Sequence, residues 1–550
     1  MIFFHIIIFF ISIVLFSFSI AGYGSLLRLK TENNFFIDIF LGFTVISFIV
    51  TTSHFFLKIN LLVSSLIFLI GLIIYLKKKN IDVSYEFIKK NIFYIIIVFL
   101  IIPMFISQKY HEDFGYYHLP YALGFIEEKI VFGYSNINPA YVYNSIWLNL
   151  YSIFFLNGKN FDFLTLPSFI LYLTFILFSL NQIISKKNKL ISDYYLVVVL
   201  FYLILKFTRI SEFGVDIPSV IFSILGIYYF IKFFETILEN EKKKYFFLIV
   251  IFSLFSILIK LSTFPIILLS LYVYLRYFKN LKSSLIDYRF LFIFLLFLSF
   301  LIQQFIYSGC FFFPTNLTCF NVNWFNTEFL NLSKGLRLVN KSYFIEAKEI
   351  YSPEEYLSNF NWVYFWIKRN FIEVSEHFLT IIIPSFLFLF LLKKKDKFDL
   401  FFKEKNVLFV FLILSLIFWL HFSPVYRFAI HLFVTLAFIF LLNLFLSRNF
   451  SKKIFVYFIS IFILFNFSKN ISRVIKVDEW FVGTQKIENK YLINQTYGNE
   501  FIKIFRPDVE NNSKNGWQGR LCWNIPFICS YNKLNVSKKN GYLIVNELQN

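Results

Sequence analysis

Residues 91–120 read NIFYIIIVFLIIPMFISQKYHEDFGYYHLP: a long apolar run ends near Ser107, and two acids follow it among histidines and tyrosines. Apolar runs of this kind recur along the chain, and lysine clusters separate them. The chain is 58% hydrophobic, 23% aromatic and only 16% charged. This composition and pattern are typical of helices that cross a bilayer many times. We therefore expect an all-α polytopic membrane protein.

The chain is strongly basic, because 53 Lys and Arg residues stand against 33 Asp and Glu residues and give a net charge of +20. On a soluble chain such a surplus of positive charge would suggest that the protein binds nucleic acid. Here many of the basic residues lie in short loops between apolar runs, where they indicate topology through the positive-inside rule. We therefore expect the lipid bilayer as a partner and no nucleic acid.

The lysine clusters, placed on the cytoplasmic side, predict about 14 spanning helices. The predicted spans are residues 2–20, 36–56, 61–76, 92–107, 163–184, 193–210, 217–236, 245–261, 264–277, 289–307, 376–392, 406–421, 425–446 and 454–468. With this map nearly every lysine cluster falls on one side of the membrane.

The apolar run 145–156 is too short, at about 12 residues, to span a bilayer easily. Counting it as a span would also reverse the sidedness of the lysine clusters that follow. We expect it to lie flat as an interfacial helix, with Trp147 and Tyr151 at the headgroup boundary. The main outer segments are then a large first loop at 108–162, a second at 308–375 and a small C-terminal external region at 469–550.

The four cysteines test this topology independently. Cys310 and Cys319 fall in one predicted outer segment, and Cys522 and Cys529 fall in another. Two local disulfides are the natural interpretation, and they persist only in an oxidising compartment, which agrees with the outer placement. Four unpaired cysteines are a weaker interpretation, and a zinc site is weaker still because the spacings are long and no histidine lies near either pair.

Acids gather at the predicted outer surface in two places: Glu112 and Asp113 follow one helix, and Glu212 and Asp216 lie in a short turn. A carboxylate there can take the proton of a hydroxyl or amine as that group forms a new bond. Asp113 is the candidate base, with Glu112 and Asp216 as further catalytic candidates. Short acidic turns also solvate helix ends, and for Glu212 that explanation has even weight.

Basic residues on the same face could hold the charge of a departing phosphate. Lys260 lies at a predicted outer helix end, and Arg427 follows an outer turn, so both run against the prevailing charge bias. Arg209, just before the second acidic turn, is a third candidate that could instead pair with Glu212. A basic residue at membrane depth often only snorkels or pairs, and that alternative applies to each.

The histidines keep open the alternative that the protein binds a divalent metal ion as a cofactor. Several of them lie near the outer surface and could join Asp113 or Asp216, but no spacing identifies such a site. These histidines are His111, His118, His377, His421 and His431. We expect His118, with Tyr117 and Glu212, in the wall of a substrate pocket.

A helix is followed by an outer loop that begins Asp113-Phe-Gly-Tyr-Tyr-His118-Leu-Pro, and then by interfacial helices, two spans and a second acidic turn. The order of these segments resembles the GT-C class of membrane glycosyltransferases. The resemblance covers most of the chain. It implies a sugar donor linked to polyprenyl phosphate and an acceptor that is a glycan, a lipid or a protein. It also implies the bacterial inner membrane, with the active site facing the periplasm.

A narrower likeness joins the chain to a group of bacterial multi-spanning membrane proteins with no assigned substrate. The segments that carry it are Asp113 to His118, Gly124 to Glu128, Asn144-Ser145-Ile146-Trp147, Ser308-Gly309-Cys310 with Pro314, Thr318-Cys319, and Cys522-Trp523.

The GT-C resemblance implies that Asp113 matches the acid that orients or deprotonates the acceptor, and that Asp216 matches the acid of the second turn. Lys260 and Arg427 match by role only. The chain departs from the pattern by an extra N-terminal part at 1–91, before a core at 92–468, and by a Glu112-Asp113 pair where many relatives have one acid or the reversed pair. Which acid is the base stays open.

Two other classes compete with this interpretation. A polymerase or ligase of envelope polysaccharide would use the second loop, with Lys334, Arg337, Lys341 and Tyr343, and Asp113 would be dispensable. A non-enzymatic transporter of lipid-linked glycans would carry charged or helix-breaking residues near the bilayer midplane, often in repeated halves. The acids instead gather at one surface, which favours chemistry there.

Overall fold

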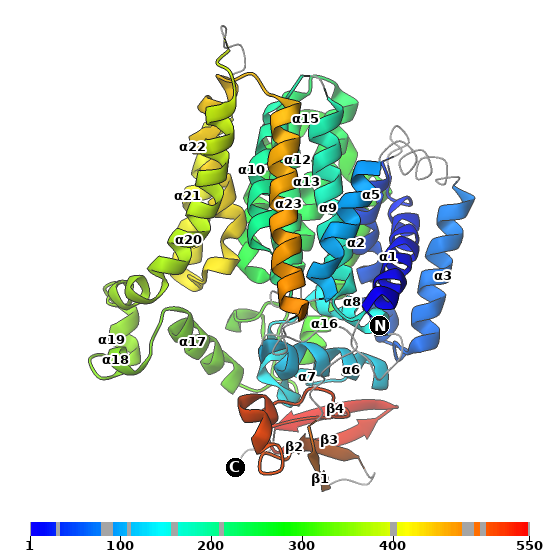
Figure 1. The fold of residues 1–550 in the computed structure, drawn as a ribbon. Helices are drawn as coiled ribbons and strands as arrows, with labels where there is room; N and C mark the ends of the chain where they lie inside the picture. Colours follow the sequence, from blue (N-terminus) through cyan, green and yellow to red (C-terminus); the bar gives the residue numbers. More distant parts are fainter. Residues whose placement is uncertain are drawn as a thin grey trace.

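The computed structural model describes residues 2–28, 34–78, 92–106, 112–155, 163–186, 188–207, 214–395, 404–475, 489–495 and 502–547. Helices dominate these residues and stand side by side along one direction, with short strands at one end of the molecule (Figure 1). The mainly helical character that the sequence predicts is therefore confirmed.

Helix α1 (Ile2–Gly24) approaches α2 (Phe35–His54) and α3 (Leu61–Lys77) very closely, and the next described helix is α5 (Ile92–Ile106). A Cβ atom on Gly42 would lie 1.9 Å from the carbonyl oxygen of Ile20, and one on Gly22 would lie 1.9 Å from that of Gly71. Small residues let helix backbones meet in this way, which is how membrane helices gain van der Waals contact.

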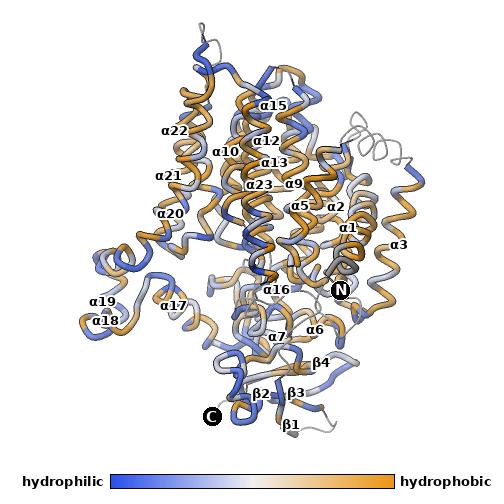
Figure 2. Tube along the Cα trace, viewed as in Figure 1, coloured by the Kyte–Doolittle hydropathy of each residue, from blue (hydrophilic) through white to orange (hydrophobic). Residues whose placement is uncertain are grey.

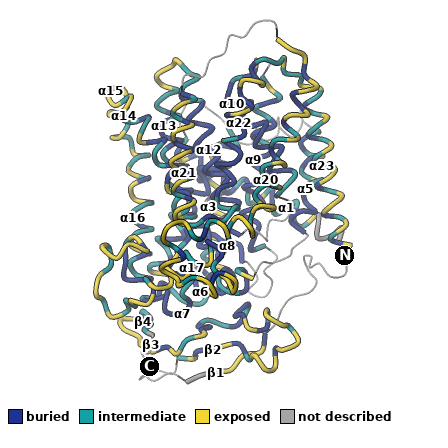
Figure 3. Tube along the Cα trace, turned by 90° about the vertical axis from the view of Figure 1, so that its left-hand side faces the viewer, coloured by how far each residue is buried: buried dark blue, intermediate teal, exposed yellow. Residues whose placement is uncertain are grey.

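The helices at the centre of the bundle are largely buried (Figure 3). They are α9 (Leu166–Ser185), α10 (Ile191–Lys206), α12 (Asp216–Glu235) and α13 (Glu239–Ile259). The later helices that surround them are α14 (Ile267–Arg276), α16 (Tyr288–Ser308), α20 (Trp362–Leu391), α21 (Lys405–Phe422), α22 (Ile430–Leu446) and α23 (Lys452–Ile475). Helix α23 packs beside α5, so the end of the bundle closes against its beginning.

Eight helices of the described residues are long and apolar enough to cross a membrane, and a bent pair, Leu261–Arg276 with Phe278–Ile286, would make nine. Apolar residues fill the bundle, and polar residues gather at its two ends (Figure 2). Each predicted span contains helix in its described residues. The number of helices that are long and apolar enough to cross a membrane is nevertheless smaller than the predicted number of about 14. Helix α5 has 15 residues, which gives it roughly 23 Å against a hydrocarbon core of roughly 30 Å.

The first outer loop is folded into short helices. These are the π-helix η1 (Phe114–His118), α6 (Leu119–Glu127), α7 (Tyr134–Ile137), the 3-10 helix η2 (Pro139–Val142) and α8 (Ile146–Phe154). We expected α8 to lie at the headgroup boundary, but Trp147 and Tyr151 are buried, and the Trp147 indole donates to Ser168 Oγ at 3.0 Å. The helix instead packs against α2, α3 and α9 inside the protein.

The second outer segment is also helical and ends earlier than the sequence predicts. It contains α17 (Glu328–Asn340), α18 (Ile345–Lys348) and α19 (Pro353–Leu357). Helix α20 begins at Trp362 and not near residue 376, because its first turns carry charged residues that an apolar-span criterion leaves out. A helix of 30 residues is about 45 Å long and extends past the membrane core.

The C-terminal region forms two small antiparallel sheets, which hold all the named strands of the described residues. Strand β1 (Tyr491–Gln495) pairs with β2 (Lys503–Pro507), and β3 (Leu534–Lys539) pairs with β4 (Tyr542–Glu547), with the 3-10 helix η8 (Ser513–Arg520) between the two hairpins. The region begins beyond residue 475, because α23 continues past the predicted boundary at 469.

This C-terminal region is packed onto the first outer loop. The backbone N–H of Trp523 donates to the carbonyl of Gly115 at 2.9 Å, and the N–H of Val545 donates to the carbonyl of Phe132 at the same distance. The backbone N–H of Phe527 donates to Glu127 Oε2 at 3.1 Å. The last part of the chain therefore covers the loop that carries Asp113.

Both predicted disulfides are present. Cys310 pairs with Cys319 just after α16, and Cys522 pairs with Cys529 in the C-terminal region. The lysine clusters of α13 and of the short helix α15 (Phe278–Leu281) lie at the end of the bundle opposite the strands (Figure 1).

Gly115→Ala is expected to destabilise the protein by about 1–3 kcal/mol, because a Cβ atom there would lie 2.4 Å from the ring of the fully buried Trp523. The matched control is Gly335→Ala in α17, where an added Cβ meets nothing within 4 Å. The control should be neutral or stabilising, since alanine favours helix over glycine. Thermal unfolding of the detergent-solubilised chain measures both, and equal melting temperatures for the two variants would contradict the packing.

Candidate active site

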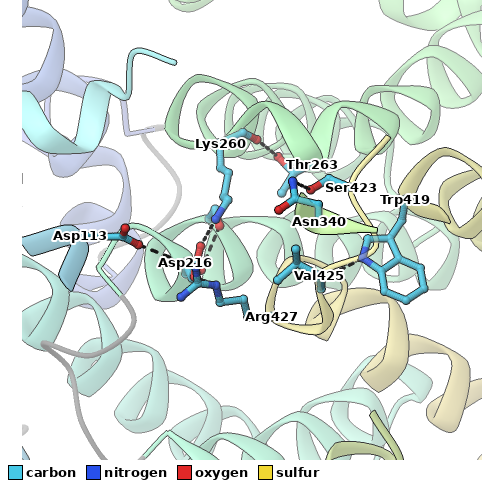
Figure 4. Close-up of polar contacts among 10 residues, drawn as sticks. Asp113, Asp216, Lys260, Thr263, Asn340, Trp419, Ser423, Val425 and Arg427 are labelled. Carbon is cyan, nitrogen blue, oxygen red and sulfur yellow. Dashed lines mark hydrogen bonds and ion pairs between the residues drawn. The ribbon is translucent and has the colours of Figure 1, made fainter. Parts of the chain in front are cut away.

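Four charged residues from distant parts of the chain meet in one cluster (Figure 4). Asp113 directly precedes η1, and Asp216 is the first residue of α12. Lys260 directly follows α13, and Arg427 lies in the 3-10 helix η7 (Tyr426–Phe428) between α21 and α22. The sequence named all four as site candidates, and their meeting is a result of the fold.

Asp216 is the centre of this ion cluster. Its side chain is only 5% exposed, and each carboxylate oxygen faces a cation. Lys260 Nζ is hydrogen-bonded to Oδ1, and Arg427 Nε lies 3.3 Å from Oδ2. A carboxylate buried to this extent persists as an anion only when it is paired, and the N-terminus of α12 adds a favourable dipole.

Asp113 joins the cluster from the first outer loop. Arg427 Nη2 lies 3.7 Å from Asp113 Oδ2, so the guanidinium bridges the two aspartates. The side chain of Asp113 remains 33% exposed, which leaves it accessible from outside. Two aspartates and two cations make the formal charge of the cluster zero.

Lys260 is held in place by its local backbone. Helix α13 stops at Lys260, whose extended conformation is followed by a 3-10 turn that contains Pro265. The hydroxyl of Thr263 donates to the Lys260 carbonyl at 2.9 Å, and the ammonium lies 3.4 Å from the ring centroid of Phe428. A cation over an aromatic face is attracted by the ring quadrupole. Sequence reasoning missed Phe428, since 83 phenylalanines give no signal for one of them.

Tyr117 lies within electrostatic range of Asp113, Asp216 and Arg427, and His118 follows it in η1. Their place in the wall of a substrate pocket stays a prediction. Burial, and then the charges of Asp113 and Asp216, raise the pKa of Tyr117 well above its usual range. Its phenol is therefore neutral and able to donate a hydrogen bond at physiological pH. His118 is buried against Gly214, where an added Cβ would lie 2.5 Å from the imidazole.

Three other site candidates lie outside the described residues. They are Arg209, Glu212 and His111. Glu112 is exposed beside Asp113. In the part of the chain that the structure describes, no three His, Cys, Asp or Glu side chains are grouped in a way that could hold a metal ion.

Asp216→Asn is expected to cost about 3 kcal/mol of stability, because it leaves the largely buried cations Lys260 and Arg427 without their main counter-charge. The control, Glu346→Gln, breaks the exposed ion pair with Lys368 and should change the melting temperature little. Denaturation of both variants in the same detergent measures the difference. A melting temperature for Asp216→Asn that matches the wild type would show that the cluster does not contribute to the fold.

Comparison with known proteins places the chain in a family. The model of a family described as a domain of unknown function, DUF8201, matches residues 1–434. No curated protein and no solved structure matches the chain. The matched residues include the whole ion cluster and stop before α23 and the strands. The chain therefore belongs to the DUF8201 family.

Proposed function

We propose that this protein is a membrane glycosyltransferase that moves a sugar from a polyprenyl-phosphate donor to an acceptor on the periplasmic side of the bacterial inner membrane. The observation that carries the proposal is the position of Asp113. Its partly exposed carboxylate stands at the end of the membrane helices, beside a cluster that supplies two cations. A base next to cations is the arrangement that transfer from a phosphate-linked donor requires.

In the proposed reaction, a hydroxyl or amine of the acceptor attacks the anomeric carbon of the sugar. The bond between that carbon and the phosphate oxygen breaks, and its electron pair leaves with the phosphate. The acceptor proton passes to Asp113, and polyprenyl phosphate is released with one more negative charge. Lys260 and Arg427 lie where they would stabilise that charge as it develops.

Asp113 is a better candidate for the base than Asp216. Both oxygens of Asp216 face cations, and its side chain is almost fully buried, so an acceptor has little access to it. We therefore assign Asp216 to positioning Lys260 and Arg427. Glu112 is exposed and contributes no ion pair among the described residues, which makes it the weaker choice and a good control.

Two independent features support the proposed membrane side. Local disulfides in the segments after α16 and at the C-terminus fit an oxidising compartment such as the periplasm. The lysines at the start of α13 and in α15 belong to helix ends at the side of the bundle opposite the strands (Figure 1), as the positive-inside rule expects for the cytoplasm. The GT-C resemblance adds the order of the two acidic segments along the chain.

A polymerase or ligase of envelope polysaccharide is the second candidate. It is supported by the contact between Arg337 of α17 and His421 of α21, whose closest nitrogens are 3.1 Å apart. Such an enzyme would depend on these basic residues and would tolerate the loss of Asp113. Activity of an Asp113 variant therefore separates the two candidates.

Asp113→Asn is expected to lower sugar transfer by about a hundredfold or more, because the amide cannot accept the acceptor proton. The assay follows labelled sugar from a polyprenyl-phosphate donor in membranes that carry the wild type or the variant. Glu112→Gln is the matched control, since it removes one charge from the adjacent exposed position and should retain most activity.

Folding is checked by detergent-extracted yield and melting temperature. Full transfer by a folded Asp113→Asn protein would refute the base assignment and favour the polymerase or ligase. No transfer by the folded wild type with any donor tested would refute the enzyme class.

A further inference from the structure

A second group of basic side chains lies close to the ion cluster. Arg337 and Lys341 come from the end of α17, and His421 comes from the end of α21. Arg337 Nη2 lies 3.1 Å from His421 Nε2, and His421 lies within electrostatic range of Lys341 as well. We call these three residues the basic trio. An adjacent hydrogen bond from Asn340 Nδ2 to Ser423 Oγ, 2.7 Å long, fixes α17 to the end of α21.

Lys341 is the buried member of the trio, whereas Arg337 is partly exposed and His421 is exposed. Lys341 is only 2% exposed, and its ammonium lies 4.2 Å from the ring centroid of Trp362. Burial, and next the charge of Arg337, lower the pKa of Lys341 to about 8. Arg337 Nε is buried and has no hydrogen-bond partner among the described residues.

No carboxylate of the described residues pairs with the trio, which distinguishes it from the ion cluster. Among the described residues, the charges that act on Lys341 and His421 are those of the trio itself: Arg337 on both, and Lys341 on His421. The ion cluster balances its own charges, whereas the trio retains a positive surplus in a partly buried place. Buried cations are normally compensated by an anion, and an arginine fork beside a lysine suits the oxygens of a phosphate.

The trio borders the proposed active site. From Ser423 the chain runs through Pro424 and Val425 to Arg427, and this turn is held by two indoles. Trp366 Nε1 donates to the Pro424 carbonyl at 2.7 Å, and Trp419 Nε1 donates to the Val425 carbonyl at 2.8 Å. Figure 4 shows Asn340 and Ser423 in the same close-up as Lys260 and Arg427.

The trio also borders an apolar surface that faces outward from the bundle. Phe264 and Phe422 are each about half exposed, and the ring of Phe418 lies against both, with centroids 6.2 and 4.6 Å away. The exposed apolar residues of α21 continue this surface along a candidate membrane span. They are Phe409, Val410, Ile413, Leu414, Ile417 and Leu420. A hydrocarbon chain gains free energy by packing on such an apolar surface, whereas a soluble anion does not.

We propose that Arg337, Lys341 and His421 bind the phosphate of a membrane lipid whose hydrocarbon chain lies along Phe264, Phe418 and α21. The inference deepens the proposed transfer reaction and rests on it only for the identity of the lipid as the sugar carrier. The trio anchors the phosphate through its surplus charge. Lys260 and Arg427, already paired with aspartates, act on the charge that develops at the bond that breaks.

The test is equilibrium binding of a radiolabelled polyprenyl phosphate to the full chain in nanodiscs of zwitterionic lipid. Arg337→Gln/Lys341→Gln should weaken binding about tenfold or more, because it removes charge-assisted hydrogen bonds to the phosphate. The matched control, Lys334→Gln/Lys348→Gln, removes the same charge from exposed positions of the same segment and should change affinity less than about twofold. Arg337→Gln alone serves if the double variant does not fold.

Two competitor arms identify the ligand. The uncharged polyprenol should bind about tenfold or more weakly than the polyprenyl phosphate, and millimolar inorganic phosphate should not displace the lipid. Displacement by inorganic phosphate at that concentration would overturn the lipid assignment, and equal affinity of the folded double variant and the wild type would overturn the site.

The transfer assay separates this inference from the proposed function. Binding that depends on the trio, in a wild-type protein that transfers no sugar, upholds the site and refutes the transferase. The opposite result is that Asp113→Asn loses transfer while Arg337→Gln/Lys341→Gln keeps full lipid binding and full transfer. That result upholds the transferase and refutes the lipid-phosphate site.

Discussion

The pairing of Asp216 with Lys260 and Arg427 is the constraint on which this end of the helix bundle depends. It joins the start of α12, the end of α13 and the turn between α21 and α22, and Arg427 extends it to Asp113 in the first outer loop. None of these charges could be buried alone, because each would lose its hydration without compensation. The need to pair them fixes how four distant segments meet.

The first outer loop is held from two sides. The ion cluster holds Asp113 at its beginning, and the C-terminal region covers η1 and α6 through Trp523 and Phe527. The close contact of Gly115 with the Trp523 ring leaves no room for a side chain there. A carboxylate held in this way has little conformational freedom left to lose on binding a ligand, and preorganised sites save free energy for this reason.

Balanced and unbalanced charge give the two basic groups different chemistry. Lys260 and Arg427 already compensate aspartates, so any anion that approaches them competes with an existing pair. The trio at α17 and α21 has no described carboxylate and adjoins an apolar surface. Loss of activity on substitution of Arg337 therefore does not distinguish a transferase from a polymerase, because a lipid-phosphate site is expected in both. The role of Asp113 is what separates them.

The sequence by itself determined the membrane class, the helical segments and both disulfide pairs, because apolar periodicity, lysine placement and cysteine spacing are local signals. It also named Asp113, Asp216, Lys260 and Arg427, since charged residues beside apolar runs stand out. Tertiary structure decided what these residues touch. The burial of Trp147, the cation–π contact of Phe428, the early start of α20 and the packing of Trp523 on Gly115 depend on segments far apart in the chain, and no local pattern encodes which distant segments will meet.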